Sequence, residues 1–235
     1  MMEKFKWTIV IPTLWKSEVT MDLLNGLTSC DYVGEILVID NCPDQRPSIT
    51  QNSKIKILSQ IKNIFVNPAW NLGVNKSKFD MICLCNDDVL FDLDVFRYLD
   101  SLKIKRTIFG CHWSNYETDI TEKNTKLGHS IGQGWGCILF FSKQYYLPIP
   151  DELIIYAGDD WLVDKFKYVK SICFNVRTIM STTSSIKELN NLAEQDIVNF
   201  RNFVSERRIK RIQKLSSTSL DNFLFLKKLR FLYIS

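Results

Sequence analysis

Short apolar runs, separated by amphipathic and polar stretches, are the most regular feature of this chain. The clearest is Met81–Cys85, which contains no polar residue apart from two cysteine thiols. A run of this kind predicts a strand buried on both faces, as a parallel sheet requires. Other apolar segments predict further strands at residues 7–11, 35–40, 56–58, 107–110, 136–142 and 171–176.

Amphipathic stretches between these segments predict helices at residues 17–29, 69–78, 92–103 and 159–169. The alternation of strands and helices is typical of βαβ units. We therefore predict an α/β domain over residues 1–180, with a mostly parallel central sheet flanked by helices. Residues 114–134 are polar and predict a long loop. Residues 181–235 are charged and helix-compatible and predict a helical C-terminal extension.

Polar residues gather where three of the predicted strands end. These ends read Pro12-Thr13-Leu14-Trp15, Asp40-Asn41 and Asn86-Asp87-Asp88. Because the carboxyl ends of parallel strands lie at one edge of a sheet, these residues can converge on one ligand. Thr13 and Asp40 can hydrogen-bond a base or ribose, and Trp15 offers a stacking face. A simple turn at Thr13 and a cap at Asp40 are the alternatives for each residue taken singly.

Asp87 and Asp88 are adjacent carboxylates that directly follow the most apolar strand. Such a pair repels itself unless a cation or hydrogen-bond donors offset the charge. Carboxylate oxygens are ligands for hard cations, which commonly share their coordination with phosphates. The pair therefore predicts a site for a hard metal ion.

A second acidic pair, Asp159-Asp160, follows Gly158 at the predicted start of a helix. One interpretation is a helix N-terminus that favours acidic side chains. The other is a general base, a carboxylate that takes a proton from an attacking hydroxyl. Nearby tryptophans and glycine could contact the sugar acceptor; they are Trp135, Gly136 and Trp161.

Asn71 lies in a loop-to-helix segment that precedes Met81–Cys85. Capping of the helix explains an Asn in such a segment. In the functional interpretation, Asn71 orients a nucleotide diphosphate or its sugar.

The bulk composition permits a small anionic substrate and does not require nucleic acid. The 235 residues are 46% hydrophobic and 24% charged, with a formal net charge of +4. The seven cysteines form no CxxC pair, which favours reduced thiols and a cytoplasmic location. No apolar run approaches the ~20 residues of a membrane span, and we expect no signal peptide.

Taken in order, the motifs resemble the GT-A glycosyltransferases, particularly family 2, over residues 5–175. The matching segments are Ile9-Val10-Ile11-Pro12-Thr13, Val38-Ile39-Asp40-Asn41, Asn71-Leu72-Gly73, Asn86-Asp87-Asp88 and Gly158-Asp159-Asp160. The resemblance implies a Rossmann-like GT-A domain and a metal-dependent, inverting transfer of a sugar from a nucleotide diphosphate sugar, with UDP the expected nucleotide. The acceptor would be a hydroxyl of a glycan or of a lipid-linked molecule.

The resemblance also implies a role for each matching residue. The nucleotide sugar would be bound by Pro12, Thr13, Trp15, Asp40, Asn71 and Asp87. Asp88, with Asp87, would bind Mn²⁺ or Mg²⁺, and Asp160, with Asp159 beside it, would be the base. The chain departs from the family at three positions, which are Asn86 for a first Asp, Trp70 for an Arg, and Asp159 for a Glu.

Three other classes of protein share parts of this pattern. A nucleotidyltransferase of sugar phosphates would share the sheet and the metal carboxylates, but Leu14-Trp15-Lys16-Ser17 is not its Gly-rich basic loop. A non-catalytic nucleotide- or carbohydrate-binding module is a further alternative. A phosphatase box at Asp92–Asp94 would need to follow a buried strand directly, whereas the predicted strand has already ended at Asn86 and Asp92–Asp94 fit a helix N-terminus better.

Two features outside the motifs have functional alternatives. His129, in the polar loop, could be a metal ligand, an acceptor contact or merely a solvated side chain. The C-terminal segment combines basic residues with Phe and Leu near residues 220–234. It either packs on the domain as a helix or lies on an anionic membrane surface as a peripheral contact.

Overall fold

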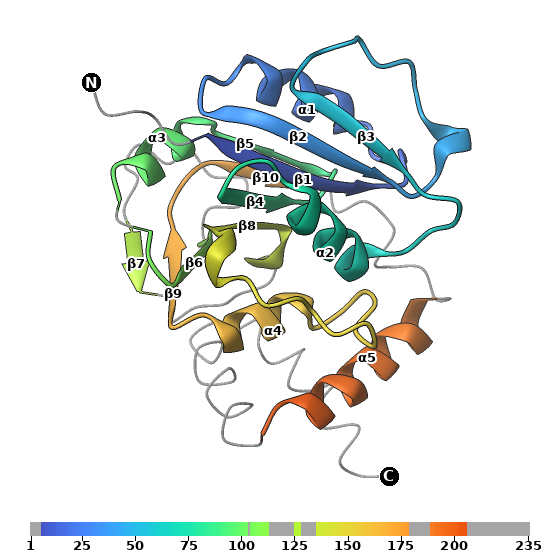
Figure 1. The fold of residues 1–235 in the computed structure, drawn as a ribbon, viewed down its shortest axis with the longest axis vertical. Helices are drawn as coiled ribbons and strands as arrows, with labels where there is room; N and C mark the ends of the chain where they lie inside the picture. Colours follow the sequence, from blue (N-terminus) through green and yellow to red (C-terminus); the bar gives the residue numbers. More distant parts are fainter. Residues whose placement is uncertain (1–5, 103, 113–124, 128–134, 179–188, 206–235) are drawn as a thin grey trace.

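The computed structural model describes residues 6–102, 104–112, 125–127, 135–178 and 189–205. At its centre is an eight-stranded sheet in the order β3-β2-β1-β4-β8-β6-β9-β7 (Figure 1). Its strands are β1 (Trp7–Thr13), β2 (Val33–Asp40), β3 (Ile55–Ser59), β4 (Met81–Cys85), β6 (Thr107–Cys111), β7 (Thr125–Leu127), β8 (Ile138–Ser142) and β9 (Tyr168–Ile172). A separate antiparallel pair is formed by β5 (Val89–Phe91) and β10 (Val176–Thr178).

Strands β1 to β4 form the parallel half of the sheet, as the alternation predicts. Thr13, the last residue of β1, lies opposite Asp40, the last residue of β2. The prediction for β1 ended too early, because Pro12 and Thr13 still belong to the strand. Proline lacks an N–H, but β4 pairs with β1 only as far as Val10, so Pro12 lies where β1 has lost one neighbour.

The other half of the sheet is mixed, because β8 runs antiparallel between β4 and β6. An apolar run predicts a buried strand but not its direction, so this reversal could not be predicted from the sequence. Cys85 at the end of β4 lies opposite Ile138 at the start of β8. The reversal therefore brings the short turn η3 (Trp135–Cys137) to the edge where β4 ends. There the N–H of Asn86 donates to the carbonyl of Cys137 at 2.9 Å.

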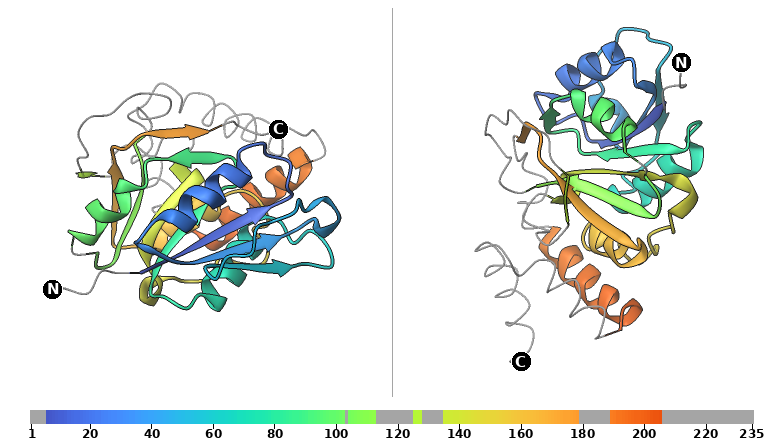
Figure 2. Two further views of the ribbon diagram at one scale, coloured as in Figure 1. Left: turned by 90° about the horizontal axis from the view of Figure 1, so that it is seen from above. Right: turned by 90° about the vertical axis from the view of Figure 1, so that its left-hand side faces the viewer.

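Helices cover both faces of the sheet (Figures 1 and 2). α1 (Thr20–Ser29) and α3 (Asp94–Asp100) pack on one face, and α2 (Val66–Lys76) and α4 (Gly158–Lys165) on the other. The helix predicted at 159–169 ends earlier, because residues 168–172 form β9. That segment is rich in the aromatic and β-branched residues that strands favour. Two short turns, η1 (Pro43–Gln45) and η4 (Lys143–Tyr145), complete the described elements.

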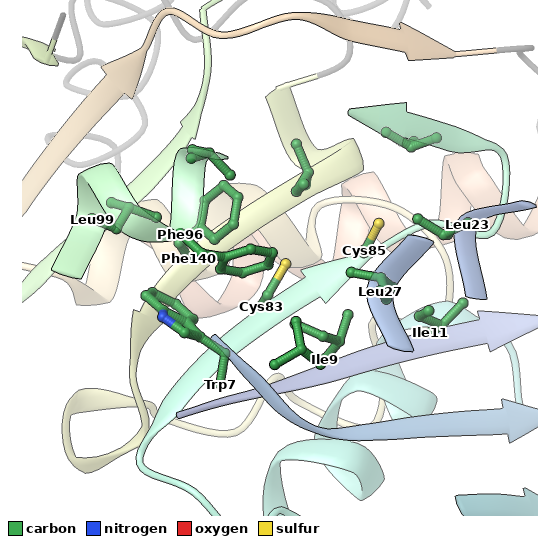
Figure 3. Close-up of a cluster of buried hydrophobic side chains, with 14 of the residues drawn as sticks. Trp7, Ile9, Ile11, Leu23, Leu27, Cys83, Cys85, Phe96, Leu99 and Phe140 are labelled. Atoms are coloured by element: carbon green, nitrogen blue, oxygen red, sulfur yellow. The ribbon is translucent and has the colours of Figure 1, made fainter. Parts of the chain in front are cut away.

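The core between α1, α3 and the sheet is aromatic at its centre (Figure 3). Trp7 is fully buried and contacts Phe96 and Phe140, with ring centroids 5.4 Å and 5.8 Å apart. Cys83 and Cys85 of β4 pack here as small apolar side chains, and burial raises the pKa of both thiols well above its ordinary value. Every cysteine of the chain is a free thiol in the structure.

Helix α5 (Asn190–Phe203) lies within the segment predicted as a helical extension and packs beside α4 (Figure 1). Phe200 and Val204 are buried in the second core, which lies between α2, α4 and the other face of the sheet. The ring of Phe203 contacts Trp161 of α4 edge-on. None of the helices in the described parts of the chain is long and apolar enough to span a bilayer. The basic and apolar segment at 206–235, the predicted membrane contact, lies outside the described residues.

Candidate active site

Thr13 and Asp87 join the ends of β1 and β4. The Thr13 hydroxyl donates to Asp87 Oδ2 at 2.6 Å and accepts the Trp15 N–H at 2.8 Å. The hydroxyl of Thr20, the first residue of α1, donates to the Asp87 carbonyl at 3.1 Å. The structure thus brings together residues that the sequence pattern placed at two separate strand ends, and it fixes Asp87 from two elements.

The environment of Asp87 and Asp88 favours a nearby cation. Burial raises the pKa of Asp87 to about 6; the Thr13 hydrogen bond partly offsets this, and the charge of Asp88 raises the pKa further. A cation reverses such a shift, because it stabilises the charged carboxylate.

The donor set fits a divalent ion that also binds phosphate. In the described parts of the chain, no group of three or more His, Cys, Asp and Glu side chains could hold a metal ion. Asp87 and Asp88 alone would offer two hard carboxylates. A diphosphate and water would have to supply the remaining ligands, as is usual for Mg²⁺. His129, the other metal candidate, lies outside the described residues.

Asp40 is fully buried at the end of β2 and already has several partners. Its Oδ1 accepts the Trp15 indole N–H at 2.7 Å and the Cys42 N–H at 3.1 Å. Its Oδ2 lies 3.4 Å from the Arg46 guanidinium and accepts the Ser59 hydroxyl at 3.5 Å. A nucleobase that contacts Asp40 directly has to displace one of these groups.

Trp15 has a left-handed backbone, with φ of 60°, directly after β1. This conformation is unfavourable for an L-residue with a large side chain. Its N–H bond to Thr13 and its indole bond to Asp40 hold it in place. The predicted nucleoside-binding residues Thr13, Trp15 and Asp40 are therefore one connected group, with Trp15 as the bridge.

The Asn71 side chain is hydrogen-bonded to other residues of the chain. Its Nδ2 donates to the Ile149 carbonyl at 2.7 Å, and its Oδ1 accepts the Tyr146 hydroxyl at 2.6 Å and the Ile149 N–H at 2.9 Å. The adjacent Trp70 is buried in the second core. These bonds fix α2 to the segment after β8, and the placement of Asn71 gives its predicted diphosphate contact no support.

Gly136 connects the second acidic pair to the end of β4. A Cβ atom built on Gly136 would lie 2.5 Å from Asp159 Oδ2, so only glycine leaves room for that carboxylate. The next residue, Cys137, accepts the N–H of Asn86. Asp159 therefore lies against the same sheet edge as Asn86-Asp87-Asp88, although the two acidic pairs are far apart in the sequence.

Asp159 and Asp160 open helix α4, and their environments differ. Asp159 Oδ1 accepts the Asp160 N–H at 3.0 Å. Burial raises the pKa of both carboxyls, and the charge of Asp159 raises that of Asp160 further, whereas backbone hydrogen bonds partly offset the shift of Asp159. A raised carboxyl pKa suits a general base that works near neutral pH.

The two predicted acceptor-binding tryptophans are packing residues in this structure. Trp135 is 1% exposed, and its ring lies so close to Gly110 that a Cβ there would be 2.3 Å from the indole. Trp161 donates its indole N–H to the Pro148 carbonyl at 3.1 Å, and the Lys165 ammonium lies 3.8 Å from its ring. Their placement does not support contact with a sugar. Gly136, the third candidate, lies directly against the Asp159 carboxylate.

Asn67 is a residue whose importance the sequence did not reveal. Its side-chain Nδ2 donates to the Tyr156 carbonyl at 3.1 Å, and its backbone N–H donates to the Ile154 carbonyl at 3.1 Å. A Cβ on Gly158 would lie 2.1 Å from Asn67 Oδ1. Asn67 therefore anchors the segment that leads into the acidic pair, a contact that no local sequence pattern signals.

Comparison of the sequence with protein-family models and with curated proteins finds no match. Solved structures do match in fold. TarS of S. aureus, residues 1–349, superposes with a TM-score of 0.54 at 11% identity, over 90% of this chain and 70% of that one. A mannosyltransferase of Pyrobaculum calidifontis in complex with GDP-Man and Mn²⁺ gives 0.60 at 12% identity, over 91% and 69%.

GalNAc-T7, solved with UDP, GalNAc and Mn²⁺, superposes with a TM-score of 0.57 at 10% identity, over 78% of this chain and 45% of that one. The longer TarS structure is likewise spanned over 45% of its length. All these neighbours are GT-A glycosyltransferases. The chain therefore has the GT-A fold, and the predicted fold class is confirmed.

Proposed function

We propose that this protein is a metal-dependent glycosyltransferase that transfers a sugar, with inversion, from a nucleotide diphosphate sugar to a hydroxyl acceptor. One observation carries the proposal. Two acidic pairs, Asp87-Asp88 and Asp159-Asp160, meet at one edge of a GT-A sheet through the contact chain of Asn86, Cys137 and Gly136. The GT-A neighbours include complexes with UDP, UDP-GlcNAc and GDP-Man, which supports a nucleotide-sugar donor.

The donor is assigned to the ends of β1, β2 and β4. Thr13 and Trp15 would bind the nucleoside. Asp40 orients Trp15 by accepting its indole N–H. Asp87 would meet the ribose or the metal ion, since Thr13 orients its carboxyl. UDP is the nucleotide we propose.

Asp88, with Asp87, would hold Mn²⁺ or Mg²⁺. When bound, such an ion stabilises the negative charge that develops on the departing diphosphate. The two carboxylates lie on a partly buried turn directly after β4, so they would hold the ion at this strand end.

Asp160 would take the proton from the acceptor hydroxyl, which is a poor nucleophile until it is deprotonated. Inversion requires that the nucleophile and the leaving group lie on opposite faces of the sugar. A base on α4 and a diphosphate site at β4 are separate elements that can flank the anomeric carbon, by the same logic that places two carboxyl groups around it in glycosidases.

The acceptor side is proposed to lie around Gly136, where the acidic pair adjoins the sheet edge. We propose a glycan or a lipid-linked hydroxyl as the acceptor. A cytoplasmic location suits the free thiols, and the basic C-terminal segment is the part of the chain proposed to contact a membrane surface.

A donor panel tests the proposal. The protein is heated with UDP- and GDP-sugars, with and without Mn²⁺, and the melting temperature is measured. A donor present at a hundred times its Kd should raise the melting temperature by about 5–10 °C, and only when Mn²⁺ is present. The same mixtures should release nucleoside diphosphate slowly, because water can replace the acceptor.

Two outcomes would contradict the proposal. Stabilisation by a nucleotide sugar without any turnover would indicate a binding module. Release of pyrophosphate from a nucleoside triphosphate and a sugar phosphate would indicate a nucleotidyltransferase.

A further inference from the structure

Helix α5 carries a buried carboxyl group whose partners are all in another segment. Asp196 is 1% exposed. Its Oδ1 accepts the N–H of Ile154 at 2.9 Å, and its Oδ2 accepts the N–H groups of Ile155 at 2.6 Å and Tyr156 at 2.8 Å. Three consecutive backbone donors thus converge on one side chain, and these bonds offset the large cost of burying a carboxyl.

Residues 154–156 are also bound by a residue of α2. The backbone N–H of Asn67 donates to the Ile154 carbonyl, and its Nδ2 donates to the Tyr156 carbonyl, each at 3.1 Å. Residues 154–156 therefore lie between Asp196, which accepts their three N–H groups, and Asn67, which donates to the carbonyls of Ile154 and Tyr156. We call this arrangement the clasp.

The clasp ends immediately before the acidic pair. After Tyr156, the backbone turns through Ala157, which is left-handed with φ of 57°, and then Gly158, which lies against Asn67. Asp159 follows directly, with its carboxyl against Gly136. A shift of the turn is therefore transmitted to Asp159 and Asp160 over two residues of constrained backbone.

Docking of α5 does not by itself explain a carboxyl at position 196. Phe200 and Val204 already bury the helix against the core, and the Asn199 side chain donates to the Glu152 carbonyl at 2.8 Å. An apolar side chain at 196 would pack against the domain as well, but it would leave three backbone N–H groups buried without acceptors.

We propose that Asp196 is a positioning residue that sets the acidic pair for catalysis, so that α5, within the predicted C-terminal extension, completes the active site. The inference rests on the proposed function of Asp159 and Asp160. It assigns to the helix a role in transfer rather than in donor binding, because the residues assigned to the donor lie at or just after the ends of β1, β2 and β4.

The test compares Asp196→Asn with Asn199→Ala in the full chain. The amide in Asp196→Asn places an NH₂ group toward backbone N–H donors, so at least one bond of the clasp is lost. Asn199→Ala, one turn along the same helix, removes a contact with Glu152 and leaves the clasp intact. Hydrolysis of UDP-GlcNAc with Mn²⁺, UDP affinity by calorimetry and amide hydrogen exchange are measured for each.

For Asp196→Asn we expect a fall in the hydrolysis rate of about 100-fold, the scale of a misplacement of about 1 Å, with UDP affinity within about twofold of the parent. The acid limb of the pH–rate profile should also move to lower pH, because a looser turn admits water to the acidic pair and reduces the shift caused by burial. Asn199→Ala should leave rate and profile unchanged within about twofold. A hydrolysis rate and a pH profile in Asp196→Asn that match those of Asn199→Ala would overturn the proposal.

Hydrogen exchange keeps the proposal testable if Asp196→Asn does not fold. In the unaltered protein, the amides of residues 154–156 should exchange as slowly as those of α5, since both are in one cooperative unit. Exchange at the rate of an open loop would overturn the clasp. If the protein hydrolyses no nucleotide sugar at all, the proposed function fails while slow exchange still supports the clasp, so the two failures are distinguishable.

Discussion

The two acidic pairs of this molecule are held in opposite ways. Asp87 follows the central strand β4, and its neighbours Thr13 and Asp40 end the adjoining parallel strands β1 and β2. Asp159-Asp160 instead opens a short helix after a left-handed residue, and its position depends on α2, η3 and α5. Sheet topology therefore places the first pair, whereas contacts between distant segments place the second.

Under the proposed function, this difference separates donor binding, at the first pair, from catalysis, at the second. The parallel strand ends form a rigid edge suited to hold a donor. The acidic pair has been assembled from surrounding elements that bury it and raise its pKa, as catalytic groups often require. Changes at the first pair should therefore weaken donor binding, and changes at the second should slow transfer while binding is preserved.

The largest effect is expected for Asp160→Asn. An amide cannot accept the proton of the acceptor, so transfer should fall about 1000-fold, within the range for loss of a general base, while donor affinity stays within about twofold. Single-turnover transfer and calorimetry with UDP and Mn²⁺ measure the two effects. Asp159→Asn is the matched control, with an expected loss of about tenfold. The base assignment is wrong if Asp159→Asn shows the larger loss.

Asp88→Ala is expected to have the next largest effect, on binding. This change should weaken Mn²⁺-dependent donor affinity about 100-fold, because the chain would lose one of the two carboxylates proposed to hold the ion. Isothermal titration with and without Mn²⁺ measures this. Asp94→Ala is the control, since Asp94 pairs with Arg97 on the exposed side of α3, and it should change nothing. A strong effect of Asp94→Ala would instead revive the phosphatase interpretation.

The same difference explains what could be predicted from the sequence. Apolar runs locate β1, β2 and β4, and parallel topology then places Thr13, Asp40 and Asp87 at one edge without further information. The direction of β8 was not predictable, because an apolar run has no polarity, and the short β5 and β10 carry too few residues for a pattern.

The contacts that surround Asp159-Asp160 could not be predicted from the sequence either. The sequence pattern identified Asp159 and Asp160 but not Asn67 and Asp196. These two side chains hydrogen-bond to backbone groups. Because every residue type carries the same backbone groups, such contacts cannot be read from the sequence. The packing contacts of Trp135 and Trp161 could not be predicted for a related reason. A large aromatic residue fits a sugar site and a core equally well, and the 1% exposure of Trp135 becomes visible only in the fold.

A smaller effect is expected for Gly136→Ala. The added Cβ would meet Asp159 Oδ2 at 2.5 Å, so the carboxylate has to move, and transfer should fall about tenfold with donor affinity unchanged. Gly26→Ala in α1 is the matched control, because its Cβ would lie 3.7 Å from Leu93, which is ordinary contact. That variant should leave transfer unchanged and stabilise the protein by about 0.5–1 kcal/mol. Equal transfer rates in the two variants would contradict the placement of Asp159.

The smallest effect concerns stability and its dependence on pH. The pKa of Asp160 is raised in the folded protein, so above the ordinary carboxyl pKa the unfolded chain loses its proton first and the folded state is penalised. The penalty is absent at pH values below that ordinary pKa, grows as the pH rises, and is complete above the raised pKa. Asp160→Asn removes it and should increase the free energy of unfolding by about 1 kcal/mol at pH 8, with no gain near pH 3. Urea unfolding across this range measures the difference, and Asp94→Asn on the exposed face of α3 should show none of this pH dependence. A gain in stability from Asp160→Asn that stays constant with pH would mean that folding does not raise the pKa of Asp160. The second pair would then not differ from an exposed carboxylate in its titration.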